Sequence, residues 1–146
     1  MAAVPKPKKK IDLDAKLWKI FSLYVRMRDA KRTTGSFELC KCVTCRRILP
    51  FAKMDAGHCI SRSKLSTKFD ERNVHAQCRD CNSNRHSLGE QNAHKYYIIS
   101  AYGQSVLDEL EYKSKKFVQL RDADYEHLIA KFSEKLDMIK GKDKAE

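Results

Sequence analysis

The sequence of 146 residues predicts an α+β fold, in which a ββα module braced by cysteines lies between an N-terminal helix and several C-terminal helices. Two Cys-x-x-Cys pairs, Cys42/Cys45 and Cys78/Cys81, mark the ends of this module. Between and just after the pairs, the order of apolar, polar and turn-forming residues predicts a strand, a loop, a short strand and a helix. Apolar residues recur at helical spacing on both sides of the module, which predicts the flanking helices.

The four paired cysteines predict one structural zinc site per chain. Each Cys-x-x-Cys turn supplies two thiolates, and two such turns supply the four ligands of a tetrahedral Zn²⁺. The first residues lack the apolar stretch of a secretory signal, so metal ligation explains six cysteines better than a disulfide framework does. Cys40 can compete with Cys42 as a ligand, although it lacks the tight spacing. Cys59 is interpreted as a small buried hydrophobic residue.

Charge and length restrict the function classes. Lysine and arginine outnumber aspartate and glutamate by 30 to 19, a net charge of +11, which favours a polyanionic partner such as nucleic acid. No apolar run approaches the roughly 20 residues that span a bilayer, so no membrane partner is expected and the protein is expected in the cytoplasm. The length suits one domain at 11–146, with a finger core at 40–89 and a helical part at 90–140. Residues 1–10 are expected to be a disordered basic arm, which fits either a phosphate-binding tail or a solvated terminus.

The flanking helices are expected from their apolar stripes. The first spans residue 11 to about 31, and its stripe comprises Leu13, Leu17, Ile20, Phe21, Tyr24 and Val25. Its opposite face carries Lys19, Arg26, Arg28 and Lys31, which fits a solvated surface or a contact with DNA. Three further helices are expected over 91–102, 105–117 and 122–140. The last has the clearest stripe, formed by Tyr125, Leu128, Ile129, Phe132, Leu136 and Ile139. Core packing explains such stripes first and a dimer interface second.

Within the module, residues 53–60 are expected to form a short strand that Gly57 interrupts. Residues 61–73 are expected to form a polar, basic loop, and residues 73–77 the second strand. A helix is expected to begin after Cys81, with Asn82 at its start, and to be broken by Gly89.

The stretch DAGHCISRS at 55–63, followed by FDERNVHAQCRDCN at 69–82, resembles the NinG (Rap) family of lambdoid phage recombination endonucleases. The resemblance covers roughly residues 40–112. It implies a metal-dependent, structure-specific endonuclease that acts on branched DNA, such as Holliday junctions and D-loops. It also implies a phage- or prophage-encoded protein that works in the cytoplasm of a bacterial host cell.

More distantly, the pattern is similar to the HNH (ββα-metal, treble-clef) superfamily and to the phage junction-resolving endonuclease VII. That protein has an Asp-x-x-His on the strand between its knuckles and an Asn directly after the final Cys. These positions correspond to Asp55, His58 and Asn82. Many HNH members instead carry an acidic residue before the catalytic His and a His after the final Cys, where this chain has Gly57 and Asn82.

Asp55, His58 and Asn82 are therefore the candidate catalytic residues. Phosphodiester hydrolysis requires a base that activates water and a cation that stabilises the developing charge. His58 suits the base, because a neutral imidazole is available near neutral pH, while Asp55 and Asn82 supply oxygen ligands for Mg²⁺ or Mn²⁺. Residues three apart point to opposite faces of an ideal strand, so Asp55 and His58 converge only if the backbone bends, which a bulge at Gly57 can permit. His58 can alternatively be a buried core histidine or a spare zinc ligand.

Four further residues have roles expected from their positions. Arg62 and Arg85 lie beside the proposed site and are expected to contact the scissile phosphate, with solvated charge as the alternative. His86 is expected to contact phosphate or metal. Asn73 is expected to be structural, with its amide bracing the loop between the strands.

Two other function classes remain open: a zinc-stabilised nucleic-acid-binding module without catalysis, and a scaffold that binds recombination partners. The expected partner is branched or duplex DNA. A homodimer is also expected, because resolving a junction requires two nicks and each chain carries one site. Its interface is expected on the stripes at 11–31 and 122–140.

Overall fold

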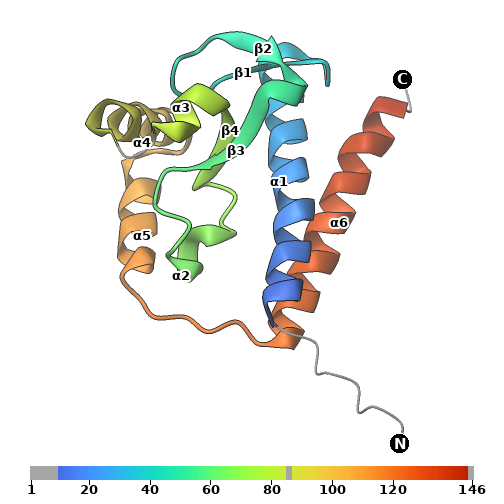
Figure 1. The fold of residues 1–146 in the computed structure, drawn as a ribbon, viewed down its shortest axis with the longest axis vertical. Helices are drawn as coiled ribbons and strands as arrows, with labels where there is room; N and C mark the ends of the chain where they lie inside the picture. The colour runs from blue at the N-terminus through green and yellow to red at the C-terminus, as the bar shows by residue number, and fades with distance from the viewer. Residues whose placement is uncertain (1–9, 85–86, 145–146) are drawn as a thin grey trace, which may run out of the picture.

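The structure is a computed structural model that describes residues 10–84 and 87–144, so the expected basic arm lies outside the described residues except for Lys10. Its elements are α1 (Lys10–Thr34), β1 (Leu39–Lys41), β2 (Ile48–Pro50), the 3-10 turn η1 (Phe51–Lys53), β3 (Met54–His58), α2 (Leu65–Lys68), β4 (Val74–Cys78), α3 (Arg79–Ser83), α4 (Leu88–Tyr102), α5 (Gln104–Ser114) and α6 (Asp122–Lys144). Two small sheets lie among these helices (Figure 1), which confirms the predicted α+β class. None of the helices in the described part of the chain combines the length and apolarity that crossing a bilayer demands.

Two antiparallel hairpins form the centre of the chain. β1 pairs with β2, and the turn between them carries the first cysteine pair. β3 pairs with β4 residue for residue, from Met54 opposite Cys78 to His58 opposite Val74. α3 follows β4 without a break, so the predicted order of strand, loop, strand and helix is confirmed.

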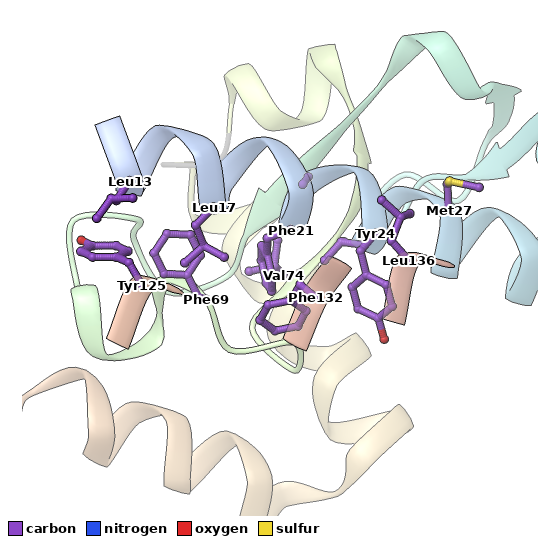
Figure 2. Packing of buried hydrophobic residues seen from close by; sticks show 12 residues of the cluster. Leu13, Leu17, Phe21, Tyr24, Met27, Phe69, Val74, Tyr125, Phe132 and Leu136 are labelled. Carbon is purple, nitrogen blue, oxygen red and sulfur yellow. The ribbon is translucent and has the colours of Figure 1, made fainter. Parts of the chain in front are cut away.

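Helix α1 supports both the hairpin and the C-terminal helix. It contains no glycine or proline, and it ends at Gly35, which has a φ of 73° and donates its N–H to the carbonyl of Lys31 at 2.9 Å. Its apolar stripe is buried in one cluster with residues of α6 and of the β3–β4 hairpin. Figure 2 shows Phe21 of α1 beside Phe132 of α6, whose rings meet edge-on with centroids 4.8 Å apart. The two stripes predicted from the sequence therefore pack against each other within the chain.

Helices α4 and α5 lie on the other side of the hairpin from α6 (Figure 1) and form a smaller cluster of their own, with Ile98, Leu107 and Leu110 buried. A buried polar contact ties α4 to β4. His75 Nδ1 lies 3.0 Å from His94 Nε2, and His75 Nε2 lies 3.0 Å from the Tyr102 hydroxyl. The three expected C-terminal helices are confirmed as α4, α5 and α6, with shifted ends.

Three expectations about local structure are wrong. Gly57 does not interrupt β3 or form a bulge, because its pairing with β4 is regular; a Cβ at this position would instead collide with the side chain of Gln77. The loop after β3 contains the short helix α2. The helix expected after Cys81 begins earlier, at Arg79, and Gly89 lies inside α4 rather than breaking a helix. Ser87 is the N-cap of α4, because its hydroxyl accepts a hydrogen bond from the backbone N–H of Glu90 at 3.3 Å.

Candidate functional site

The four paired cysteines meet at one point. Cys42 and Cys45 come from the turn between β1 and β2, Cys78 ends β4, and Cys81 lies in α3. Their sulfur atoms all lie within 4.8 Å of one another, and those of Cys45 and Cys78 are 3.9 Å apart. A tetrahedral zinc with Zn–S bonds of about 2.3 Å would hold its sulfurs roughly 3.8 Å apart, so the cluster fits this ion.

The surroundings of the cluster favour thiolates. Burial raises the pKa of Cys42, but hydrogen bonds from the Thr44 hydroxyl and the backbone N–H of Cys78 outweigh burial and lower it to about 6. The Arg47 guanidinium lies beside two sulfurs, with Nε 3.4 Å from Cys45 Sγ and Nη2 3.8 Å from Cys78 Sγ. This cation offsets part of the charge that four thiolates bring to one metal.

The two remaining cysteines lie outside this group of four. Cys40 is fully buried, and burial raises the pKa of its thiol to about 11. Burial likewise raises the pKa of Cys59 to about 11, and Cys59 packs against the α4–α5 cluster. Both thiols therefore stay protonated at neutral pH, unlike a metal ligand.

A polar cleft of about 360 Å³ borders the finger, which we define as β3, β4 and α3. The described residues that line it are Trp18, Ser22, Arg26, Ala52, Met54, Asp55, Ala56, His58, Arg62, Arg79 and Asn82. They include four residues of β3 and none of β4, so the cleft runs along the unpaired edge of β3. An edge is reached by side chains from both faces of a strand. Asp55 and His58 therefore border one cleft without the bulge that the sequence analysis required.

Asp55 and Asn82 touch each other in this cleft. The Asn82 amide donates from Nδ2 to Asp55 Oδ2 at 3.1 Å, which joins β3 to α3. Arg79 Nε lies 3.7 Å from Asp55 Oδ1. One carboxylate, one amide and one guanidinium are thus gathered directly beside the cysteine cluster, because Asn82 follows Cys81 in α3.

His58 is held on two sides. Its Nε2 lies 3.0 Å from the carbonyl oxygen of Lys68, and its ring stacks on Trp18 with centroids 5.1 Å apart at 21°. A carbonyl can only accept a hydrogen bond, so the neutral imidazole must carry its proton on Nε2, and Nδ1 is then the acceptor of the ring. The residue is 7% exposed, so only a small part of it faces solvent.

The other expected site residues are placed as follows. Arg62 is exposed on the cleft rim, with its guanidinium carbon 5.8 Å from the Trp18 ring. Arg85 and His86 lie outside the described residues. Asn73 is fully buried: its Oδ1 accepts the N–H of Ile60 at 2.8 Å, and its Nδ2 donates to the carbonyls of Ile60 and Thr67, each at 3.1 Å. Asn73 thus closes the loop that contains α2 onto the end of β3.

Sequence reasoning did not place α1 at the cleft, although it named Arg26 on a helix face that fits a solvated surface or a contact with DNA. Trp18, Ser22 and Arg26 of α1 line the cleft, although they precede the first cysteine pair. Their spacing of four places them in one row along a helix, which was the available signal. The sequence did not show which part of the molecule that row faces. Arg79 was also missed, because it stands between Cys78 and Cys81, and the sequence motif drew attention to these cysteines alone.

The fold and the site define a small α+β protein in which four clustered cysteines that could hold a metal ion lie beside a polar, arginine-lined cleft. The chain belongs to the NinG family, because the model of the family described as "Bacteriophage Lambda NinG protein" matches residues 3–142. This result confirms the resemblance that the sequence motifs indicated.

Curated relatives cover a smaller part of the chain. Protein ninG of Escherichia phage 933W is 37% identical over 71 residues, which are 48% of this chain and 34% of that protein. Protein ninG of Escherichia phage lambda is 37% identical over 71 residues, or 48% of this chain and 33% of that protein. Protein ninG of Salmonella phage P22 is 34% identical over 76 residues, which are 51% of this chain and 36% of that protein. The chain thus spans about a third of the length of the curated relatives it matches. No solved structure matches it.

Proposed function

We propose that this chain is a metal-dependent, structure-specific DNA endonuclease that acts on branched recombination intermediates, such as Holliday junctions and D-loops, in the cytoplasm of a phage-infected cell. We further propose that its finger and cysteine cluster form an HNH-like (treble-clef) unit. The observation that carries this proposal is the placement of His58. A carbonyl holds one ring nitrogen as a donor, and the same cleft contains the Asp55–Asn82 pair.

The residues of the cleft divide the chemistry between them. Nδ1 of His58 takes a proton from the attacking water, while the Lys68 carbonyl and the Trp18 ring keep the imidazole in place. Asp55 and Asn82 supply a carboxylate and an amide oxygen, the ligand types that suit Mg²⁺ or Mn²⁺. When bound, such an ion stabilises negative charge on the phosphate and on the departing 3′-oxygen. The zinc in the cysteine cluster is structural, because four thiolates leave no ligand position for substrate.

Charge supports a nucleic-acid substrate. The chain carries a net charge of +11, and the cleft itself contains three arginines and one carboxylate. Such an excess attracts a polyanion and makes binding weaker as salt rises. The preference for branched over linear DNA rests on the family resemblance.

Cleavage of a labelled four-way junction, compared with a linear duplex of the same sequence, tests this proposal. The wild-type protein should cut the junction with Mg²⁺ or Mn²⁺ added and should not cut it without a divalent ion. His58→Ala should lower the cleavage rate by about 10²–10⁴-fold, because general-base catalysis is lost. Zinc content and junction binding should stay unchanged. His127→Ala is the matched control, since His127 is exposed on α6 and outside the cleft.

The same assay separates the other function classes. Near-wild-type cleavage by His58→Ala at saturating Mg²⁺ would refute the proposed mechanism. Tight junction binding by a zinc-loaded wild-type protein that never cuts would identify a binding module without catalysis. Absence of DNA binding at low salt would favour the third class, a scaffold that binds recombination partners.

A further inference from the structure

Arg26 differs from the other arginines in the C-terminal half of α1. Arg28 donates to the Asp29 carboxylate and to the carbonyls of Glu71 and Val74, so its guanidinium ties α1 to the hairpin. Arg32 pairs with Asp29 at 2.9 Å. Arg26 instead points into the cleft along the row that begins at Trp18. It is therefore not part of the ion-pair network around Asp29.

The guanidinium of Arg26 is oriented but not paired. Its Nε donates to the carbonyl of Ser22 at 3.1 Å, and its central carbon lies 5.4 Å from the Phe51 ring. Among the described residues, no carboxylate lies within 4.0 Å of it, and its two terminal nitrogens make no hydrogen bond. A planar fork of donors is thus fixed at its base, with no protein partner for its outer nitrogens in the described part of the chain.

The charge of Arg26 is held at a cost. Burial lowers the pKa of Arg26, and the charge of Asp55 only partly opposes this effect. Asp55 is also shared, because Arg79 lies closer to it, at 3.7 Å. An anion in the cleft would offset the desolvation of Arg26 and would accept hydrogen bonds from its terminal nitrogens.

We infer that Arg26 binds a phosphate of the nucleic-acid backbone, with its two terminal nitrogens donating to two phosphate oxygens. The guanidinium fork matches the oxygens of a phosphate in spacing and in charge. A carboxamide or a water molecule bound in the same place would not match it in both. This inference rests on the proposed function and deepens it. It makes α1, which lies outside the cysteine module, part of the substrate-binding surface.

The chain contains a suitable probe for this site. Trp18 is its only tryptophan, and it lines the same cleft as Arg26. Its intrinsic fluorescence should therefore change when an anion enters the cleft. We would titrate the zinc-loaded full chain with a short single-stranded oligonucleotide and, separately, with inorganic phosphate. Both titrations are done at fixed ionic strength and without added Mg²⁺ or Mn²⁺, so that no cleavage is needed for the readout.

Arg26→Gln should weaken oligonucleotide binding about tenfold or more, the effect expected for losing a charge-assisted pair of hydrogen bonds. Arg26→Lys keeps the charge but loses the fork, so its affinity should lie between those of wild type and Arg26→Gln. Lys16→Gln is the matched control. It removes one positive charge from α1 at an exposed position outside the cleft, and it should bind like wild type within about twofold.

Two results would overturn the inference. The first is an Arg26→Gln protein that holds its full zinc content and binds the oligonucleotide as tightly as wild type does. If Arg26→Gln fails to fold, wild-type affinity in Arg26→Lys would show that the guanidinium fork does not bind the phosphate. The second is a response to inorganic phosphate alone, with oligonucleotide affinity independent of Arg26. Loss of oligonucleotide binding in Arg26→Gln, in a protein that cuts no junction, would support Arg26 as a phosphate ligand and refute the nuclease instead.

Discussion

Buried histidines serve two different purposes in this chain. His58 lies at a cleft and contacts a carbonyl, whereas His75 and His94 lie against each other in the interior, 1% and 2% exposed. Burial lowers the pKa of His94 to about 3. Burial, the neighbouring His94, and the charges of Arg28 and Arg32 hold the pKa of His75 well below its ordinary value. Both rings are therefore neutral at pH 7, and their contact is a hydrogen bond between neutral groups.

This pair predicts that acid destabilises the fold. In the unfolded chain both histidines take up a proton near pH 6.5, whereas in the folded chain they do so only at much lower pH. The free energy of unfolding should therefore fall as pH falls below about 6.5, by up to about 1.4 kcal/mol per pH unit for each histidine. Urea unfolding between pH 7 and pH 5 measures this slope.

A comparison of variants isolates the pair from other acid effects, including protonation of the clustered cysteine thiolates. His94→Gln removes one titrating ring, so its slope should be shallower than that of wild type. His127→Gln, at an exposed position of α6, is the matched control. Equal slopes for wild type and His94→Gln would show that the pair does not control acid stability.

At the scale of the elements, the cysteine cluster connects three parts of the fold. The β1–β2 turn, the end of β4 and the first turn of α3 each supply part of the cluster. α3 has only five residues and would not persist alone. A metal held by the four cysteines would fix α3 against β3 and so keep Asn82 in contact with Asp55.

Cys78→Ser should accordingly lose the zinc and lower the thermal midpoint sharply, since a structural zinc contributes folding free energy. Metal analysis and thermal unfolding measure the two effects. Cys40→Ser and Cys59→Ser should keep one zinc per chain, although Cys40→Ser places a hydroxyl in a fully buried site. Loss of metal in Cys40→Ser with retention in Cys42→Ser would reassign the ligands.

The sequence predicted the helices and the cysteine group well because both depend on local spacing. Apolar positions at helical period identify α1 and α6 without knowledge of their neighbours. The meaning of glycine was harder to predict. Gly57 suggested a bulge, but it accommodates Gln77 across the sheet, and Gly89 suggested a break, but it lies inside α4. The row of α1 residues that lines the cleft, Trp18, Ser22 and Arg26, was also not predicted. The sequence shows that a helix has a second face, but it does not show which part of the molecule that face contacts.

At the scale of the whole molecule, α1 contributes residues both to the hydrophobic core and to the cleft. Its apolar stripe packs against α6 (Figures 1 and 2), while Trp18 and Arg26 line the cleft. Phe21 and Phe132 are nearly fully buried between the two helices. These stripes were also expected to form the interface of a homodimer. Since they cover each other within one chain, a twofold interface has to use the outer surface.

A homodimer remains our prediction, because junction resolution requires two nicks. Sedimentation at micromolar concentration should then report about twice the chain mass of 16.9 kDa. Met138 is 55% exposed on α6, so Met138→Glu should weaken dimerisation and paired nicking if the outer face of α6 is used. Leu88→Glu, at an exposed position of α4, is the control. A monomer both alone and on a junction would leave an enzyme that nicks one strand.

The pairing of α1 with α6 also has a consequence for synthesis. In the described chain α1 is translated first and α6 last, so the apolar face of α1 remains uncovered until residues 122–144 leave the ribosome. The fourth cysteine, Cys81, emerges well before α6 does. A nascent chain could therefore bind a metal at its four cysteines while the apolar face of α1 is still uncovered. That interval is when we expect a chaperone to bind it, or neighbouring nascent chains to aggregate with it.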